Sequence, residues 1–160
     1  SDHPVEESIK EKIALFCDVD AKAVIPMVTT PILYEIPLLL DETGIADLLL
    51  ERLNLEAKVA PDLHAWEQLI EKIKNSKGTI KIALVGKYVE LHDAYISVRE
   101  ALNHAAIVNA VELDLTWVQS GDLEEDGGAE VLKSMDGIIV PGGFGNRGIE
   151  GKIIAAQYAR

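Results

Sequence analysis

The residues best suited to chemistry form a glycine-rich turn, Pro141-Gly142-Gly143-Phe144-Gly145-Asn146-Arg147-Gly148, which follows the hydrophobic run 137–140. We expect that run to be a buried strand, so that the turn exposes backbone N–H groups at the carboxyl edge of a sheet, where open α/β folds bind ligands. Glycine lets a ligand approach the main chain closely. Exposed N–H groups can hold a developing oxyanion or a phosphate, and the turn alone does not decide between them. Arg147 could strengthen such an anion site, or could simply hold the loop through a salt bridge.

Other local patterns carry less information. Residues 143–148 match the dinucleotide fingerprint G-x-G-x-x-G, but that fingerprint belongs to the first βα turn, whereas this turn follows the third strand of its unit. The Gly-Lys pairs at 86–87 and 151–152 lack the earlier glycine of a phosphate-binding P-loop. The 4 histidines have no metal-ligand spacing. Cys17 lies in an apolar run and is predicted to be a buried structural thiol.

Composition excludes several classes of protein. The 160 residues carry a formal net charge of −12, which argues against a nucleic-acid partner, since such a partner needs a basic stripe. No apolar run is long enough to suggest a membrane span. A single cysteine fits a reducing compartment, so we expect a cytoplasmic protein. The chain starts without methionine and stops at Arg160 inside a helical pattern, so we expect an internal piece of a longer protein.

In the first half of the chain, the short apolar run 13–17 predicts a buried parallel strand. Residues 33–40 and 45–53 predict two short helices separated by Gly44. Asp62 is expected to cap a third helix. Its apolar face consists of Leu63, Trp66, Leu69, Ile70 and Ile73.

The second half predicts a regular alternation of strands and helices. Strands are expected over 80–86, 111–118 and 137–140, with a short helix near 129–135 and another helix from residue 149. Asp93 is expected to cap the helix between the first two strands. The order β-α-β-α-β-α is that of a doubly wound α/β sheet.

Four motifs, in this order, give the whole chain a resemblance to the CTP synthase family. They are Lys12-Ile13-Ala14-Leu15-Phe16-Cys17-Asp18-Val19, Tyr34-Glu35-Ile36-Pro37-Leu38-Leu39-Leu40, Gly86-Lys87-Tyr88-Val89-Glu90-Leu91 with Asp93-Ala94-Tyr95 and Ser97-Val98, and Val140-Pro141-Gly142-Gly143-Phe144-Gly145 with Arg147-Gly148 and Glu150-Gly151. The resemblance implies an α/β fold class: the end of a P-loop-type amidoligase domain (1–55), a linker (56–79), and the first βαβαβ units of a flavodoxin-like class I glutamine amidotransferase domain (80–160).

The resemblance also implies a reaction and its participants. The family is a C–N bond-forming ligase of pyrimidine nucleotide biosynthesis, which aminates UTP to CTP with ATP, Mg²⁺ and ammonia from L-glutamine. GTP activates it, CTP inhibits it, and the working form is a homotetramer. By match of motif, Lys12 would contact UTP or CTP, Thr30 would contact ATP, and Gly143 would bind glutamine and supply an oxyanion N–H.

The same resemblance places the rest of the machinery outside this sequence. The P-loop and the Mg²⁺ carboxylates would precede Ser1, and the nucleophilic cysteine, histidine and glutamate would follow Arg160. The 160 residues alone are therefore expected to hold no catalytic or metal-binding residue and to be inactive. Two alternatives stay open: a non-catalytic flavodoxin-like or Rossmann module that binds a nucleotide or dinucleotide, and a catalytically dead paralogue that keeps only the assembly surfaces.

Overall fold

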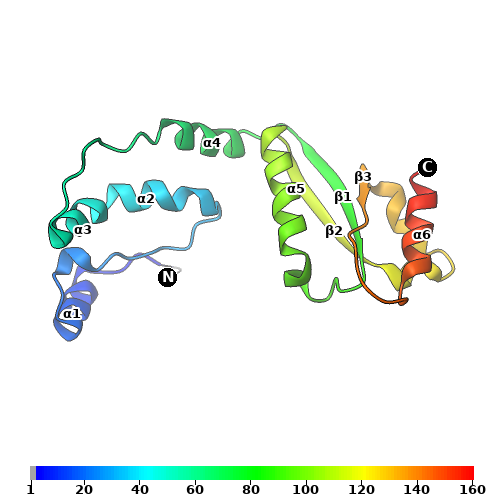
Figure 1. Cartoon of the computed structure of the whole chain (residues 1–160), viewed down its shortest axis with the longest axis horizontal. Coiled ribbons are helices and arrows are strands. Elements are labelled where there is room, and N and C mark those ends of the chain that lie inside the picture. Colours follow the sequence, from blue (N-terminus) through cyan, green and yellow to red (C-terminus); the bar gives the residue numbers. More distant parts are fainter. Residues whose placement is uncertain (1–2) are drawn as a thin grey trace. The chain divides into compact units, whose positions relative to one another are not determined.

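The computed structural model describes residues 3–160, and the chain divides into two compact units between Glu71 and Lys72 (Figure 1). This division falls inside the helix His64–Lys74 (α4). The domain limits predicted from the sequence, at residues 55 and 80, stay predictions.

The first unit is helical. Its elements are α1 (Glu7–Cys17), η1 (Ala21–Ala23), η2 (Leu33–Glu35), α2 (Ile36–Glu42), α3 (Ile45–Leu53) and most of α4. Gly44, with φ +69°, separates α2 from α3 and confirms the predicted pair of short helices. The carboxylate of Asp62 accepts a hydrogen bond from the N–H of His64 at 3.0 Å, as the predicted cap requires.

The strand predicted over residues 13–17 is wrong, because these residues form the last turns of α1. Periodicity cannot separate a strand from a helix over so short an apolar run, and here the helix-forming residues that precede it extend the helix back to Glu7. Asp18 ends the helix in the left-handed conformation, φ 53°, and its N–H bonds to Ala14 O. Cys17 is exposed, so the prediction of a buried thiol is wrong as well.

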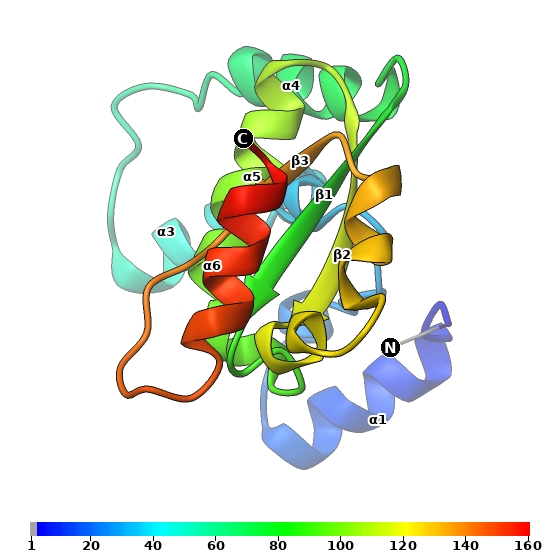
Figure 2. The same ribbon diagram turned by 90° about the vertical axis from the view of Figure 1, so that its right-hand side faces the viewer.

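The second unit contains a parallel three-stranded sheet in the order β2-β1-β3. Its strands are β1 (Thr79–Gly86), β2 (Glu112–Gln119) and β3 (Gly137–Ile139). Helix α5 (Ile96–Val108) joins β1 to β2, the 3₁₀ segments η4 (Ser120–Glu124) and η5 (Gly128–Ser134) join β2 to β3, and α6 (Ile149–Tyr158) follows β3. Figure 2 shows the sheet with the connection from β3 to α6 at the end where β1 stops. This topology confirms the predicted beginning of a doubly wound sheet.

Layers on both faces of the sheet explain why residues 83–85 of β1 are apolar and fully buried. Successive strand residues point to opposite faces, so Ala83 and Val85 pack with Ala155 of α6, whereas Leu84 packs on the other face with Tyr95. Figure 1 shows α5 on one side of the sheet and α6 on the other. The sheet is therefore the middle layer of three, and it fixes where β1 and β3 end.

Asp93 does not cap α5, which corrects the prediction. A 3₁₀ turn, η3 (His92–Tyr95), precedes the helix, and Tyr95 occupies the cap position without a side-chain cap bond. The buried Tyr95 ring packs against the end of β1, which keeps the chain in this turn before α5 begins. Among residues 3–160, no helix is long and apolar enough to cross a membrane.

Candidate functional site

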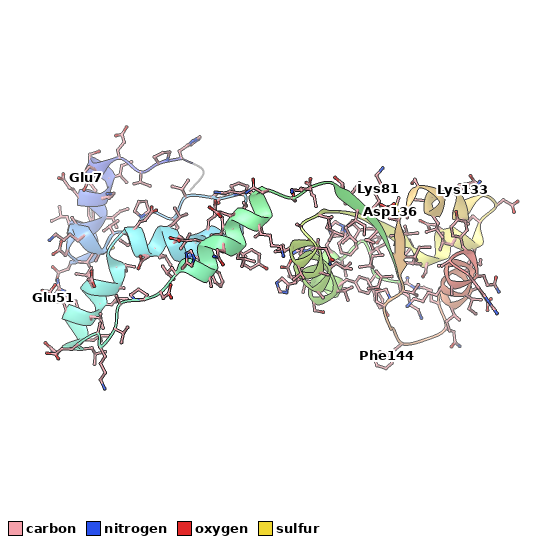
Figure 3. The ribbon with its side chains drawn as sticks, turned by 90° about the horizontal axis from the view of Figure 1, so that it is seen from above. Glu7, Glu51, Lys81, Lys133, Asp136 and Phe144 are labelled. Carbon is pink, nitrogen blue, oxygen red and sulfur yellow. The ribbon has the colours of Figure 1, made fainter. Side chains whose placement is uncertain are left out.

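The glycine loop, defined here as residues 140–148, leads from β3 to the first turn of α6. It lies at the carboxyl edge of the parallel sheet, as the sequence predicted (Figure 2). Phe144 is 96% exposed, and Figure 3 shows its side chain projecting away from the sheet. The loop is thus an open surface at the sheet edge where ligands of α/β folds bind.

Three cationic side chains hold this loop in place. Lys87 Nζ donates to Gly145 O at 2.5 Å and to Phe144 O at 3.3 Å, and Lys152 Nζ donates to Pro141 O at 2.7 Å. Arg147 donates from Nη2 to Lys87 O at 2.9 Å, and its guanidinium carbon lies 5.7 Å from the centre of the Tyr88 ring. The sequence left two roles open for Arg147, anion binding and holding the loop. The structure supports the second role, although the partners of Arg147 are a carbonyl group and an aromatic ring and not the acidic side chain of a salt bridge.

The end of β1 is built to place Lys87 under the loop. The hydroxyl of Tyr95 accepts hydrogen bonds from the N–H groups of Lys87 and Tyr88, at 2.9 and 3.3 Å. Position 86 must be glycine, since a methyl group there would lie 2.7 Å from the Tyr95 ring. Lys87 itself is only 3% exposed. Tyr95 thus fixes the backbone from which the buried lysine reaches the loop.

The surroundings of Gly143 leave room for an added atom, as they do at Gly142 and Gly145. A methyl group at Gly143 would lie 3.5 Å from Lys152 Nζ and 3.6 Å from Lys87 Cδ, which is ordinary contact, and its φ is outside the left-handed region. Within residues 3–160, no loop or turn hydrogen bond is donated by the N–H of Gly142, Gly143 or Phe144. These N–H groups are available to a ligand, and glycine at 143 leaves room for it.

The glycines that follow serve packing. A methyl group at Gly148 would overlap the hydroxyl of Ser120, and one at Gly151 would overlap the carbonyl oxygen of the same residue. Ser120 is buried in η4. The N–H of Gly151 donates to Glu124 Oε1 at 3.2 Å. These contacts hold the start of α6 close to η4 and so fix the far end of the glycine loop.

The electrostatics of the loop favour negative charge. Burial lowers the pKa of Lys152, and the nearby positive charge of Lys87 lowers it further. Two ammonium groups beside free backbone N–H groups make a local positive region in a chain of net charge −12. The arrangement is chemically suited to an oxyanion or to another small anionic group.

The two other residues predicted from the resemblance lie in the first unit. The sequence placed Lys12 directly before a predicted strand over residues 13–17. Lys12 is instead an exposed residue of the helix α1, so the expected surroundings were wrong. The hydroxyl of Thr30 donates to the Glu35 carboxylate at 2.5 Å and accepts from the Ile32 N–H at 3.3 Å. The nucleotide contacts assigned to Lys12 and Thr30 stay predictions.

Sequence reasoning missed Lys87 and Lys152 as residues of the site. Each is the second member of a Gly-Lys pair, a pattern considered only as a phosphate-binding loop. The useful signal was their placement, since one directly follows a strand and the other opens the helix after the glycine turn. Across residues 3–160, no group of three or more His, Cys, Asp or Glu side chains could hold a metal ion.

Comparison with known proteins gives two family matches. Residues 1–55 match the family described as CTP synthase N-terminus, and residues 90–160 match glutamine amidotransferase class-I. CTP synthases from Chloroflexus aggregans, Dehalococcoides mccartyi and Roseiflexus sp. are 54%, 55% and 54% identical over all 160 residues. The chain spans only 29%, 29% and 28% of their lengths. A solved glutaminase domain of Trypanosoma brucei CTPS with bound acivicin is 46% identical, with a TM-score of 0.45, over 50% of this chain and 32% of that chain.

The parallel sheet, with its glycine loop at the carboxyl edge and its family match, defines the second unit as the beginning of a class I glutamine amidotransferase domain. With the match of residues 1–55 and the identity along the whole chain, the chain belongs to the CTP synthase family, of which it represents one segment. These matches disfavour the dinucleotide-binding alternative. The topology agrees, because the glycine loop follows β3 and not the first strand of the unit.

Proposed function

We propose that this chain is part of a glutamine-hydrolysing CTP synthase, which aminates UTP to CTP with ATP and with ammonia released from L-glutamine. The observation that carries the proposal is the presence of both family matches in one chain, in order, with 52–55% identity to CTP synthases along its whole length. The chain spans less than a third of those relatives, so the remaining machinery lies elsewhere in the proposed enzyme.

In this proposal the glycine loop serves the glutaminase half-reaction. A thiolate from outside residues 1–160 attacks the carboxamide carbon of glutamine, and the carbonyl oxygen gains negative charge. We assign the N–H of Gly143 as a donor to that oxygen. The ammonium groups of Lys87 and Lys152, which bond carbonyls of the same loop, would add positive charge to its surroundings. A proton from a histidine outside residues 1–160 converts the amide nitrogen to ammonia as the carbon–nitrogen bond breaks, which leaves a thioester. Water then hydrolyses the thioester to glutamate and releases the thiol.

The first unit would contribute to the synthetase half-reaction. Lys12 projects from α1 into solvent, and we assign it to the phosphate or base oxygens of UTP or of CTP as inhibitor. Thr30 is assigned to ATP. To donate a hydrogen bond to ATP, its hydroxyl would have to give up the bond that it donates to Glu35. Mg²⁺ would accompany ATP, and none of the described residues is assigned to it. Activation by GTP, a homotetrameric assembly and a cytoplasmic location complete the proposal.

The experiment is a substrate-dependence assay on the intact protein that contains this segment. Purified enzyme is incubated with UTP, ATP and Mg²⁺, and CTP is measured with glutamine, with ammonium chloride, and with neither. The proposal expects CTP from both nitrogen sources and none without them. No CTP from either source would favour the catalytically dead paralogue, and CTP from ammonia alone would refute the glutaminase role of the glycine loop.

A further inference from the structure

We propose that Lys87 and Lys152 are positioning residues, which hold the segment from Pro141 to Gly145 in the shape that glutamine hydrolysis requires. The inference rests on the proposed function and deepens it. It concerns how the loop is kept in place, because neither lysine needs to touch the substrate in order to act.

The two lysines bond carbonyl groups of the loop that come before and after Gly143 in the sequence. Lys152, in the first turn of α6, donates to Pro141 O, and Lys87, at the end of β1, donates to Phe144 O and Gly145 O. A peptide unit is planar and trans, so fixing a carbonyl also fixes the N–H of the next residue. The units that carry the N–H groups of Gly143 and Phe144 therefore lie between two anchored planes.

Arg147 and the contacts of Gly148 hold the far end of the loop, but backbone pairing contributes little between Pro141 and Gly145. Residues 140–148 belong to no helix or strand, and the free N–H groups described above make no turn contact within residues 3–160. Oxyanion donors work because they are oriented before charge develops, so a loop that could rotate its peptides would lose that advantage. The lysine contacts supply the orientation that backbone pairing does not.

The burial of the Lys87 ammonium group is tolerated only while the loop keeps its present conformation. A buried ammonium is costly unless its hydrogen bonds are satisfied. Lys87 is 3% exposed, and both acceptors of its Nζ are carbonyls of the loop, 57 and 58 residues along the chain. If the loop departed from this conformation, the buried charge would lose its partners. The cost of burying Lys87 therefore favours the loop conformation seen here.

The test compares Lys87→Met and Lys152→Met in the intact enzyme with Lys133→Met as the matched control. Methionine keeps an unbranched apolar stem without the ammonium group. Lys133 pairs with Glu130 on η5 and makes no contact with the glycine loop (Figure 3). We measure kcat and KM for glutamine hydrolysis, ammonia-dependent CTP formation, and the rate of chymotrypsin cleavage after Phe144 in the glycine loop.

We expect each loop-lysine variant to lower kcat for glutamine roughly ten- to hundredfold, the size expected for a lost charged hydrogen bond. The KM for glutamine and the ammonia-dependent rate should change much less, and chymotrypsin should cleave faster after Phe144, which is exposed in the middle of the loop. Lys87→Arg should recover part of kcat, because it restores a donor. Lys152 is only half-buried, so Lys152→Met keeps the test decisive even if Lys87→Met folds poorly.

Three results would overturn the inference. They are glutaminase rates close to that of Lys133→Met, equal loss of glutamine- and ammonia-dependent activity, or faster cleavage after Phe144 with unchanged glutamine hydrolysis. Failure of the proposed function is seen separately, as a wild-type enzyme that cannot use glutamine at all.

Discussion

Replacement of Gly143 by alanine should lower the glutamine-dependent activity of the enzyme without lowering the stability of its fold. The added methyl group would lie 3.5 Å or more from the nearest atoms, both on flexible lysine side chains, and φ at this position does not require glycine. A Gly→Ala change at a compatible position stabilises a protein by about 0.4–1 kcal/mol through the unfolded chain. We therefore expect the variant to fold with an unchanged or slightly raised melting temperature.

The same methyl group would occupy the space into which a substrate carbonyl must move to reach the Gly143 N–H. Loss of one oxyanion donor costs about 10²–10³ in rate, or about 2.7–4 kcal/mol. In the intact enzyme, glutamine-dependent CTP formation should fall by that factor. Ammonia-dependent formation should be nearly unchanged, because free ammonia bypasses the loop.

The control is Gly121→Ala, since a methyl group there meets no atom within 4 Å and position 121 lies in η4, outside the loop. It should leave both activities at the wild-type level. Equal loss of the two activities in Gly143→Ala, or a lowered melting temperature, would refute the reasoning and make Gly143 a structural turn residue.

Three further predictions concern Gly151, Lys12 and the pKa values of two lysines. Gly151→Ala should destabilise the second unit by about 1–3 kcal/mol or more, because its methyl group overlaps Ser120 O; urea unfolding at wild-type stability would contradict this. Lys12→Ala should weaken UTP use and CTP inhibition by roughly 1.5–3 kcal/mol, and changes within about twofold in both would show that Lys12 is only a solvated charge. Burial holds the pKa of Lys152 below its ordinary value of 10.5, and the hydrogen bond to Glu130 raises that of Lys133. In an NMR titration of methyl-labelled lysines, Lys152 should therefore lose its proton first as the pH rises, and the reverse order would contradict the packing described.

The second unit could be predicted from the sequence because the second half of its first strand is buried on both faces. The run 80–86 is apolar except at Lys81, and it is found as β1 over Thr79–Gly86. The glycine turn after residue 140 then follows from a strand that stops at Pro141. By contrast, the run 13–17 is as apolar as a strand but continues a helix, and five residues are too few for periodicity to decide.

The contacts that build the site were beyond sequence reasoning. Lys87 reaches Gly145 across 58 residues, and only the parallel alignment of β1 with β3 brings the two ends together. The sequence does not indicate the role of Tyr95, whose hydroxyl accepts hydrogen bonds from the backbone at the end of β1. Patterns in a sequence indicate which elements form, but side-chain partners distant along the chain depend on how those elements pack.

Isotope transfer in the intact enzyme tests whether the glycine loop serves a glutamine-dependent synthesis of CTP. Glutamine labelled with ¹⁵N in its side-chain amide is supplied with UTP, ATP and Mg²⁺, and the CTP product is analysed by mass spectrometry and NMR. We expect ¹⁵N in the amino group at C4 of CTP, and a sharp loss of that label in Gly143→Ala. Formation of CTP without ¹⁵N from labelled glutamine, or no CTP at all, would contradict this expectation.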